Sequence, residues 1–229
     1  MEIRINASLA NMAFGEILSS ISVIIASGTA IYGISTWKRE FRGKRQIELA
    51  EEALALFYEA REVITSARSC LGFGYEGRTR ESEAEETPAQ KKARDAAYVI
   101  FERFQPHEQL FSKLYAMRYR FMAQFDLGSA KPFDELKKIR NEIFSAARRL
   151  ARLWAEDVSH FDEKRQEAHY EKVQKYESIF WDTYDEVADP INPRLDKVVS
   201  EIEAICRPVI MDKGSVFPGI RKLWAKVRK

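Results

Sequence analysis

The chain has 229 residues, of which 45% are hydrophobic and 31% are charged, and a formal net charge of +2. This length allows one well-packed domain with an appendage, and such a domain needs no disulfide to fold. Cys70 and Cys206 lie far apart and match no C-x-x-C or zinc-finger spacing. The sequence therefore gives no support for a disulfide framework or a zinc site.

Charge is distributed unevenly along the chain. Residues 38–45 carry a net charge of +4 and residues 213–229 carry +6, whereas residues 46–212 carry −7. A domain that binds nucleic acid would present a basic face on its folded body. We therefore expect no nucleic-acid partner, and we interpret the two basic segments as attachment points for an acidic body.

The N-terminal part of the chain contains a long uncharged segment. Residues 17–37, ILSSISVIIASGTAIYGISTW, form 21 consecutive positions without a charge, enough for a helix to cross a hydrocarbon core of about 30 Å. Serine and threonine dilute the apolar residues, but their hydroxyls can bond to the helix's own carbonyls. We predict a transmembrane helix over residues 14–37, preceded by a short external segment at residues 1–13. A cleaved signal peptide, or a helix buried in a soluble protein, is the alternative.

A basic juxtamembrane segment at residues 38–45 sets the predicted orientation. Only Arg4 precedes the apolar segment as a positive charge, so the positive-inside rule leaves the C-terminal body in the cytoplasm. Tyr32 and Trp37 would then lie near the headgroups. The bases expected to contact the membrane are Lys38, Arg39, Arg42, Lys44 and Arg45.

Small side chains recur at helical spacing within the same segment. Such a stripe allows membrane helices to approach each other closely, which makes self-association a hypothesis. The alternative is that small residues are simply common in weakly hydrophobic spans. The stripe consists of Ser22, Ala26, Thr29, Ala30 and Gly33.

Residues 46–212 show helical periodicity almost throughout and no sustained strand periodicity. The first body helix is predicted to continue from the membrane and to end at Gly72, with two adjacent apolar stripes. These stripes are Ile47, Ala50, Leu54, Phe57 and Ile64, and Leu49, Ala53, Leu56, Ala60 and Val63.

The stretch GFGYEGRTRE follows, with glycines at 72, 74 and 77 in G-x-G-x-x-G spacing. A dinucleotide fingerprint requires a preceding strand and a following helix that receives the pyrophosphate. No strand precedes these glycines, so we interpret them as a surface loop. Arg78 and Arg80 could hold a small anionic ligand there, although the acidic run ESEAEE directly after them offers internal partners.

Four further helical segments complete the predicted body. Thr87, Pro88 and Gln90 predict a capping box at the start of the second helix, and Pro106 should kink or break that helix. Asn192 and Pro193 predict the N-cap and first position of the fifth helix, and Pro208, Gly214 and Pro218 should then break the helical pattern. The predicted inward face of the second helix, on both sides of Pro106, is Ala97, Phe101, Phe104, Leu110, Phe111, Leu114, Phe121 and Phe125, and that of the third helix is Leu136, Ile139, Ile143, Ala147, Leu150 and Trp154. The fourth helix should end by Asp189, and its predicted inward face is Tyr170, Val173, Tyr176, Phe180, Tyr184 and Val187. The predicted inward face of the fifth helix is Leu195, Val198, Ile202 and Ile205.

Residues 213–229 form a basic segment with an amphipathic pattern. Apolar residues at i, i+3, i+4 and i+7 with bases around them are typical of a helix that lies on an anionic membrane. Docking of the stripe on the acidic body is the alternative. The apolar positions are Ile220, Leu223, Trp224 and Val227.

The three histidines, His107, His160 and His169, do not form H-E-x-x-H or a pair of Glu-x-x-His motifs. We find no catalytic motif and predict no catalytic residue, no metal and no cofactor. A hydrolase or metalloenzyme that uses carboxylates of the bundle remains an alternative.

The run STWKREFRGKRQIELAEEALALFYEAREVI, with GFGYEGRTR and KPFDELKKIRNEI, resembles uncharacterised bacterial proteins with one N-terminal membrane helix and a helical cytoplasmic body. The resemblance implies attachment to a membrane, and no activity or functional residue can be carried over from it. We thus predict an all-α protein, with a transmembrane helix that continues into an antiparallel four- to five-helix bundle. The expected function is that of a non-enzymatic interaction or scaffold module. Its expected partners are the lipid bilayer and another protein or a second copy of the chain; the alternative is a membrane-tethered sensor that binds a small anion.

Overall fold

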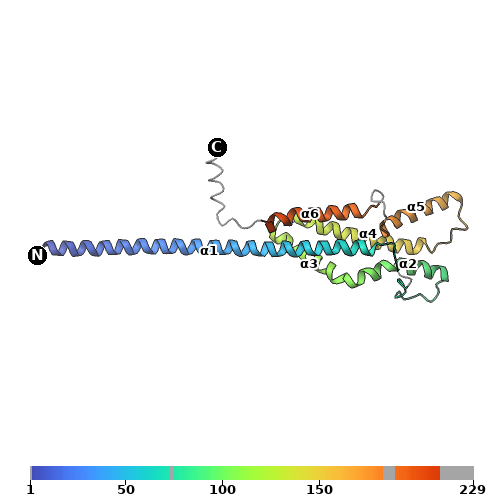
Figure 1. The fold of residues 1–229 in the computed structure, drawn as a ribbon, viewed down its shortest axis with the longest axis horizontal. Coiled ribbons are helices and arrows are strands. Elements are labelled where there is room, and N and C mark those ends of the chain that lie inside the picture. Colours follow the sequence, from blue (N-terminus) through green and yellow to red (C-terminus); the bar gives the residue numbers. More distant parts are fainter. Residues whose placement is uncertain (1, 73–74, 183–188, 212–229) are drawn as a thin grey trace, which may run out of the picture. The chain divides into compact units, whose positions relative to one another are not determined.

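A computed structural model describes residues 2–72, 75–182 and 189–211, and it describes side chains from residue 21 onward. The described residues are all-α, with six α-helices, two short 3-10 helices and no strand (Figure 1). The elements are α1 (Glu2–Ala67), α2 (Pro88–Phe104), η1 (Gln105–His107), α3 (Glu108–Gln124), η2 (Leu127–Ala130), α4 (Lys131–Leu153), α5 (Glu163–Phe180) and α6 (Asn192–Met211).

The chain divides into two compact units, Met1–Glu48 and Leu49–Lys229. Among the described residues, unit 1 consists of the first part of α1. Unit 2 contains the second part of α1 and all the other helices. Unit 2 forms a helical bundle, which confirms the predicted fold class of the body.

The core of unit 2 is built on two amphipathic helices. Helix α4 contacts α2, α3, α5 and α6, and its predicted apolar face, from Leu136 to Leu150, is at most 1% exposed. The face of α1 that begins at Leu49 and Ala50 is also buried. Phe57 of α1 meets Phe133 of α4 edge to face, with 4.8 Å between ring centroids. Because these two apolar stripes are buried, the helical spacing of their residues predicted both helices correctly.

The predicted start of α2 is confirmed in detail. Thr87 accepts a hydrogen bond from the Gln90 amide, the Gln90 side chain accepts one from the Thr87 amide, and Pro88 occupies the first helical turn. The predicted break at Pro106 is also confirmed, because η1 separates α2 from α3 there. Proline has no amide hydrogen, so a helix loses one internal hydrogen bond there and is kinked or broken.

Two predicted helix ends were wrong. Helix α1 ends at Ala67 rather than at Gly72, because the Arg103 side chain donates to the carbonyls of Ala67, Ser69 and Leu71 and replaces a glycine cap. Pro208 does not end α6, which continues to Met211. The residues around Pro208, including the buried Cys206, pack against the core and hold the last turn in place.

The prediction for the fourth body helix was wrong in part. Helix α5 ends at Phe180, and Tyr170 is 58% exposed although it was expected to face inward. Phe180 is buried and Val173 and Tyr176 pack against the core, as predicted, whereas the buried positions His169 and Ile179 were not predicted. Tyr184 and Val187 lie outside the described residues. The helix stops where Trp181 adopts an extended backbone conformation.

Asn192 begins α6, as predicted, but its side chain is not the cap. The Asp189 carboxylate accepts the amides of Ile191 and Asn192 at 2.7 and 3.0 Å, so an aspartate three residues earlier satisfies these donors. The Asn192 side chain is thereby available for other contacts.

Within the part of the chain whose residues could be assessed, no helix is both long enough and apolar enough to cross a membrane. The predicted span at residues 14–37 includes residues 14–20, whose side chains lie outside the described set.

Candidate functional site

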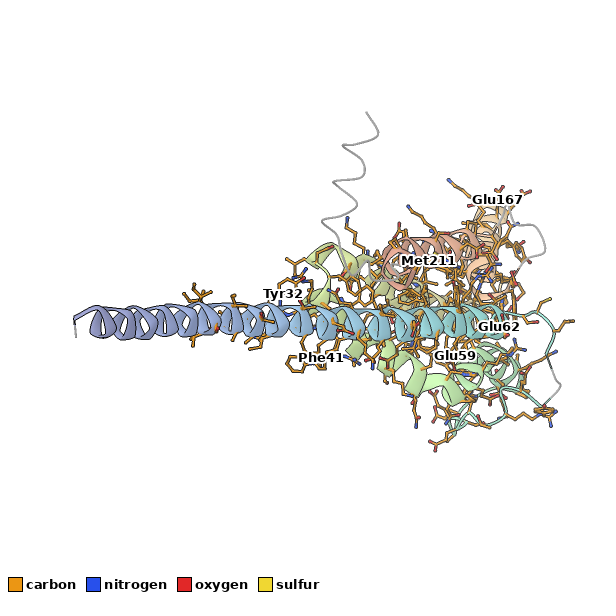
Figure 2. All side chains as sticks on the ribbon, turned by 60° about the vertical axis from the view of Figure 1, so that its left-hand side comes forward. Tyr32, Phe41, Glu59, Glu62, Glu167 and Met211 are labelled. Carbon is orange, nitrogen blue, oxygen red and sulfur yellow. The ribbon has the colours of Figure 1, made fainter. Side chains whose placement is uncertain are left out.

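Unit 1 exposes large apolar side chains over the described part of the predicted span. All residues from Ile21 to Ser35 are exposed, and Ile24 and Ile31 are exposed to 71% and 69%. Figure 2 shows Tyr32 and Phe41 projecting from the helix. No side of residues 21–37 carries a charge, which differs from the pattern of a helix on the surface of a soluble domain. At 100° per residue the small side chains of the predicted stripe occupy one sector of the helix, and the large apolar positions cover the rest, about two thirds of the circumference. They are Ile21, Val23, Ile24, Ile25, Ile31, Tyr32, Ile34 and Trp37.

Two hydroxyls of this segment bond to the helix itself. Thr29 donates to the Ile25 carbonyl and Ser35 donates to the Tyr32 carbonyl, both at 2.8 Å. These two bonds confirm the expected return of hydroxyls to the helix's own carbonyls. Such bonds lower the cost of placing a hydroxyl in an apolar environment.

A ladder of aromatic and basic side chains follows the apolar residues. The Trp37 and Phe41 rings stack with centroids 6.0 Å apart, and the Arg45 guanidinium lies 5.7 Å from the Phe41 centroid. The spacing of four residues places all three side chains on one face. All five predicted membrane-contacting bases, Lys38, Arg39, Arg42, Lys44 and Arg45, are exposed.

The predicted helix-packing stripe, Ser22, Ala26, Ala30 and Gly33, is also exposed, and a Cβ built on Gly33 would meet nothing within 4 Å. Packing of a second helix against it stays a prediction. The C-terminal positions Ile220, Leu223, Trp224 and Val227 lie outside the described residues.

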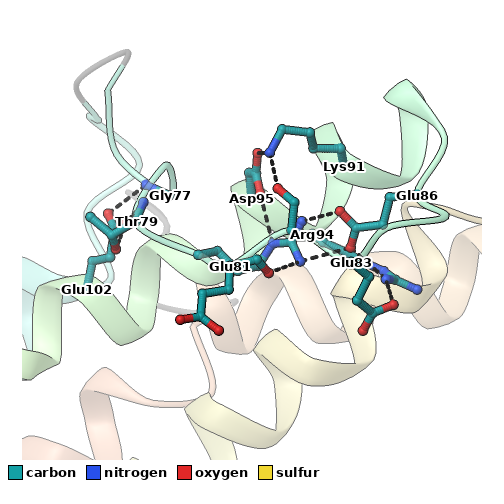
Figure 3. Close-up of polar contacts among 11 residues, drawn as sticks. Gly77, Thr79, Glu81, Glu83, Glu86, Lys91, Arg94, Asp95 and Glu102 are labelled. Carbon is teal, nitrogen blue, oxygen red and sulfur yellow. Dashed lines mark hydrogen bonds and ion pairs between the residues drawn. The ribbon is translucent and has the colours of Figure 1, made fainter.

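The loop that carries Arg80 is held by charge pairs with Glu86, which precedes α2, and with Asp95 on α2 (Figure 3). The Arg80 guanidinium forms a bidentate pair with Glu86, at 2.8 and 2.6 Å, and donates from Nε to Asp95 at 2.8 Å. Arg94 adds a second guanidinium on Glu86, at 2.7 Å. Of the acidic run expected to offer internal partners, Glu86 is engaged by Arg80 and Glu83 by Arg94.

Glu102 of α2 organises the preceding turn. Its carboxylate accepts the amides of Gly77 and Thr79, at 2.6 and 2.9 Å, together with the Thr79 hydroxyl. Burial opposes ionisation of Glu102, but these three donors outweigh it and lower the pKa of the carboxyl. Gly77 has φ of +83°, and a Cβ there would lie 2.1 Å from the Asp95 carbonyl oxygen. This glycine therefore serves close backbone packing of the loop on α2.

The two arginines predicted to bind an anion have different environments. Most donors of Arg80 are used by Glu86, Asp95 and the Glu81 carbonyl, so this side chain fixes the loop. Arg78 is exposed and has no ion pair within the described residues. Binding of an anionic ligand at these two positions stays a prediction.

The charge pairs around Arg80 should make stability depend on pH. Hydrogen bonds from Arg80, followed by those from Arg94, lower the pKa of Glu86 from about 4.5 to about 2. Because the pKa is lowered in the folded state, this carboxylate stabilises the fold above about pH 4.5, and the contribution is lost as the pH falls towards 2. We expect Glu86→Gln to be less stable than the natural protein at pH 7, with the difference shrinking steadily between pH 4.5 and 2.

Urea midpoints of both proteins at several pH values would measure this difference. Glu85→Gln is the matched control, because Glu85 is an exposed neighbouring carboxylate without an ion pair among the described residues. Two stability curves that stay parallel from pH 7 to pH 2 would contradict the assigned role of Glu86.

Sequence reasoning missed a buried cluster at the end of α1. Arg68 is 0% exposed and pairs with Asp189 at 3.0 Å, and both side chains are fully buried. Its guanidinium also donates to the Asn192 side chain at 2.9 Å, and Asn192 in turn donates to Asp182 at 2.7 Å. We call Arg68, Asp182, Asp189 and Asn192 the Arg68 cluster.

The Arg68 cluster also holds the C-terminal end of α5. Arg68 donates to the carbonyls of Ser178, Ile179 and Trp181 at 2.8 to 3.0 Å. A cation at a helix C-terminus meets the negative end of the helix dipole and satisfies carbonyls that lack helical partners. One arginine thus ties the end of α1 to the end of α5 and the start of α6.

The pKa of Asp189 reflects this environment. Burial alone would raise it, but the amides of Ile191 and Asn192 and the Arg68 charge outweigh burial, so the pKa lies below its usual value. The sequence offered only weak signals for the cluster: a base just after a helix, and an aspartate shortly before the next one.

The histidines do not form a metal centre in the described part of the chain, where no group of three or more His, Cys, Asp or Glu residues is placed to hold a metal ion. His169 Nδ1 lies 3.4 Å from a Glu156 oxygen, and the exposed His160 lies 4.0 Å from Asp157. Each pair lacks the further ligands that a metal would need.

Searches against protein-family models, curated proteins and solved structures found no match.

Proposed function

We propose that the protein is a single-pass membrane protein whose unit 1 helix anchors a cytoplasmic helical bundle, and that this bundle serves as a non-enzymatic interaction or scaffold module. In this arrangement residues 14–37 cross the bacterial inner membrane with the N-terminus outside. The bases at 38–45 then lie at the cytoplasmic headgroups. Residues 220–227 are proposed to add a second, peripheral membrane contact.

The observation that carries the proposal is the exposed and uncharged surface of unit 1 from Ile21 to Ser35, on which the isoleucines cover about half of the helix circumference. A helix that exposes large apolar side chains and carries no charge on any side is stable only when something covers it, and lipid can cover every side at once. Each square ångström of apolar surface removed from water contributes roughly 25 cal/mol. The hydroxyl bonds of Thr29 and Ser35 and the aromatic ladder from Trp37 to Arg45 both suit a helix that leaves the bilayer near residue 37.

Unit 2 is the part of the chain that we propose as the interaction module. Its arginines are mostly used in internal pairs, and α1 continues without a break from the proposed span into the core of the bundle. Binding of another protein, or of a second copy through the stripe at Ser22, Ala26, Ala30 and Gly33, is the proposed use of that arrangement.

Native cysteines allow a direct test of anchoring and orientation. Cys70 is exposed and Cys206 is buried, and burial raises the pKa of the Cys206 thiol to about 12, so near neutral pH only Cys70 should react. We expect the full chain to remain in the membrane fraction after a carbonate wash. A membrane-impermeant maleimide should label it in inverted vesicles and not in intact spheroplasts.

Two variants control this labelling. Cys70→Ser should abolish it, and Cys206→Ser should leave it unchanged. Recovery of the chain in the carbonate supernatant would overturn the anchor, whereas labelling of Cys70 in intact spheroplasts would overturn the cytoplasmic placement of unit 2.

A further inference from the structure

A shallow pocket of about 270 Å³ lies between α2, η1, α3 and α4 in unit 2. Its walls are mainly aromatic. Phe101 of α2 stacks on Phe144 of α4, with centroids 5.1 Å apart, and Phe104 meets Phe144 edge to face at 5.0 Å. Ligand sites combine such apolar walls with a small number of polar groups.

The cationic group in this pocket is the guanidinium of Arg140. Its central carbon lies 4.7 Å from the Phe111 centroid, 4.9 Å from that of Phe144 and 5.9 Å from that of Phe104. The Nε atom is buried and has no hydrogen-bond partner. Within the described residues the only hydrogen bond of the guanidinium is a long contact of 3.4 Å from Nη1 to the Tyr115 hydroxyl, close to the limit of a real bond.

This state sets Arg140 apart from other partly or fully buried arginines of unit 2. Arg68, Arg80 and Arg103 each have a carboxylate within 3.0 Å, whereas no carboxylate of the described residues lies within ion-pair distance of Arg140. Residues 46–212 carry an excess of seven acidic charges, so shortage of internal carboxylates does not explain the difference. Arg140 is half-buried, and its buried Nε atom has no acceptor; a guanidinium in this state is costly without an anion, and an incoming anion would relieve that cost.

We propose that this pocket binds a small aromatic monocarboxylate. The carboxylate accepts hydrogen bonds from Arg140, and the ring of the ligand lies against Phe101 and Phe144. Pocket volume limits the ligand to about one ring, because typical small-molecule sites enclose roughly 300–1,000 Å³. Glu108 also lines the pocket, and its negative charge disfavours ligands with a second anionic group.

Phenylacetate is the probe for this proposal, and saturation-transfer NMR on the purified full chain gives its dissociation constant. We expect phenylacetate to bind in the millimolar range or more tightly, and phenylacetamide, which lacks the charge, to bind at least 10-fold more weakly. Arg140→Gln should weaken phenylacetate binding at least 10-fold. Arg148→Gln is the matched control, because Arg148 is on α4 like Arg140 and its guanidinium lies 5.7 Å from the Phe101 centroid, but it does not line the pocket. This substitution should change phenylacetate binding less than twofold.

Glu108→Gln tests the proposal without touching Arg140. Removing the negative charge should tighten phenylacetate binding several-fold, which a loss of folding could not mimic. Absence of binding at 10 mM, equal binding of phenylacetamide, equal binding to Arg140→Gln, or no gain in Glu108→Gln would each overturn the proposed site.

Discussion

Replacing Arg68 by methionine should destabilise unit 2 by about 3–5 kcal/mol, because it leaves the Asp189 carboxylate buried without its cation. The substitution also removes the donors that satisfy the carbonyls at the end of α5 and the Asn192 side chain. Urea unfolding of the full chain, followed by circular dichroism, measures the loss. A loss of this size is a large part of the stability of an ordinary domain.

Arg61→Met is the matched control for this prediction. Arg61 lies on the same helix and also pairs with an aspartate, Asp196, but their side chains are 47% and 57% exposed. An exposed pair contributes about 0–1 kcal/mol. Equal losses for the two variants would contradict the assignment of Arg68 as the residue that ties α1, α5 and α6 together.

A second variant and the pH dependence sharpen the test. Asp189→Asn keeps an oxygen that can accept the Ile191 and Asn192 amides but removes the buried charge, so the double variant Arg68→Met/Asp189→Asn should be more stable than Arg68→Met alone. The pKa of Asp189 is lowered in the folded protein, and its contribution is therefore present at neutral pH and lost in acid. The deficit of Arg68→Met should accordingly shrink as the pH is lowered.

Neutralising the basic juxtamembrane segment should change the membrane orientation of the chain. If the proposed anchor is correct, five glutamine substitutions in this segment remove the charge difference that keeps unit 2 on the cytoplasmic side. The labelling of Cys70 in intact spheroplasts should then rise several-fold from its background. The substituted positions are Lys38, Arg39, Arg42, Lys44 and Arg45.

An equal number of glutamine substitutions on the surface of unit 2 provides the control. Bases far from the ends of a span contribute little to orientation, so this variant should label like the natural protein. The control positions, all exposed, are Lys113, Lys131, Lys164, Lys172 and Lys175. Unchanged labelling in the juxtamembrane variant would mean that something other than these five bases orients the chain.

Features that depend on neighbouring residues were predictable from the sequence. The capping box at Thr87, the break at Pro106 and the buried face of α4 follow from contacts within a few residues and from a clear apolar stripe. Helix α5 shows the limit of this reasoning. Its aromatic residues repeat at helical spacing, yet Tyr170 is exposed and His169 is buried, because the neighbours available in the bundle decided which face is covered.

The charged residues show most clearly which features the sequence determines and which the tertiary structure decides. The sequence by itself determined the all-α class, the acidic body between two basic segments and the uncharged apolar segment of unit 1, because composition and periodicity encode these properties locally. Only the tertiary structure decided that Arg68 is buried with Asp189, that Arg80 holds its own loop and that Arg140 lacks a carboxylate. The partners of Arg68 lie more than 100 residues away in the chain, and no local pattern distinguishes a base that will meet a carboxylate across the bundle from one that will remain in solvent.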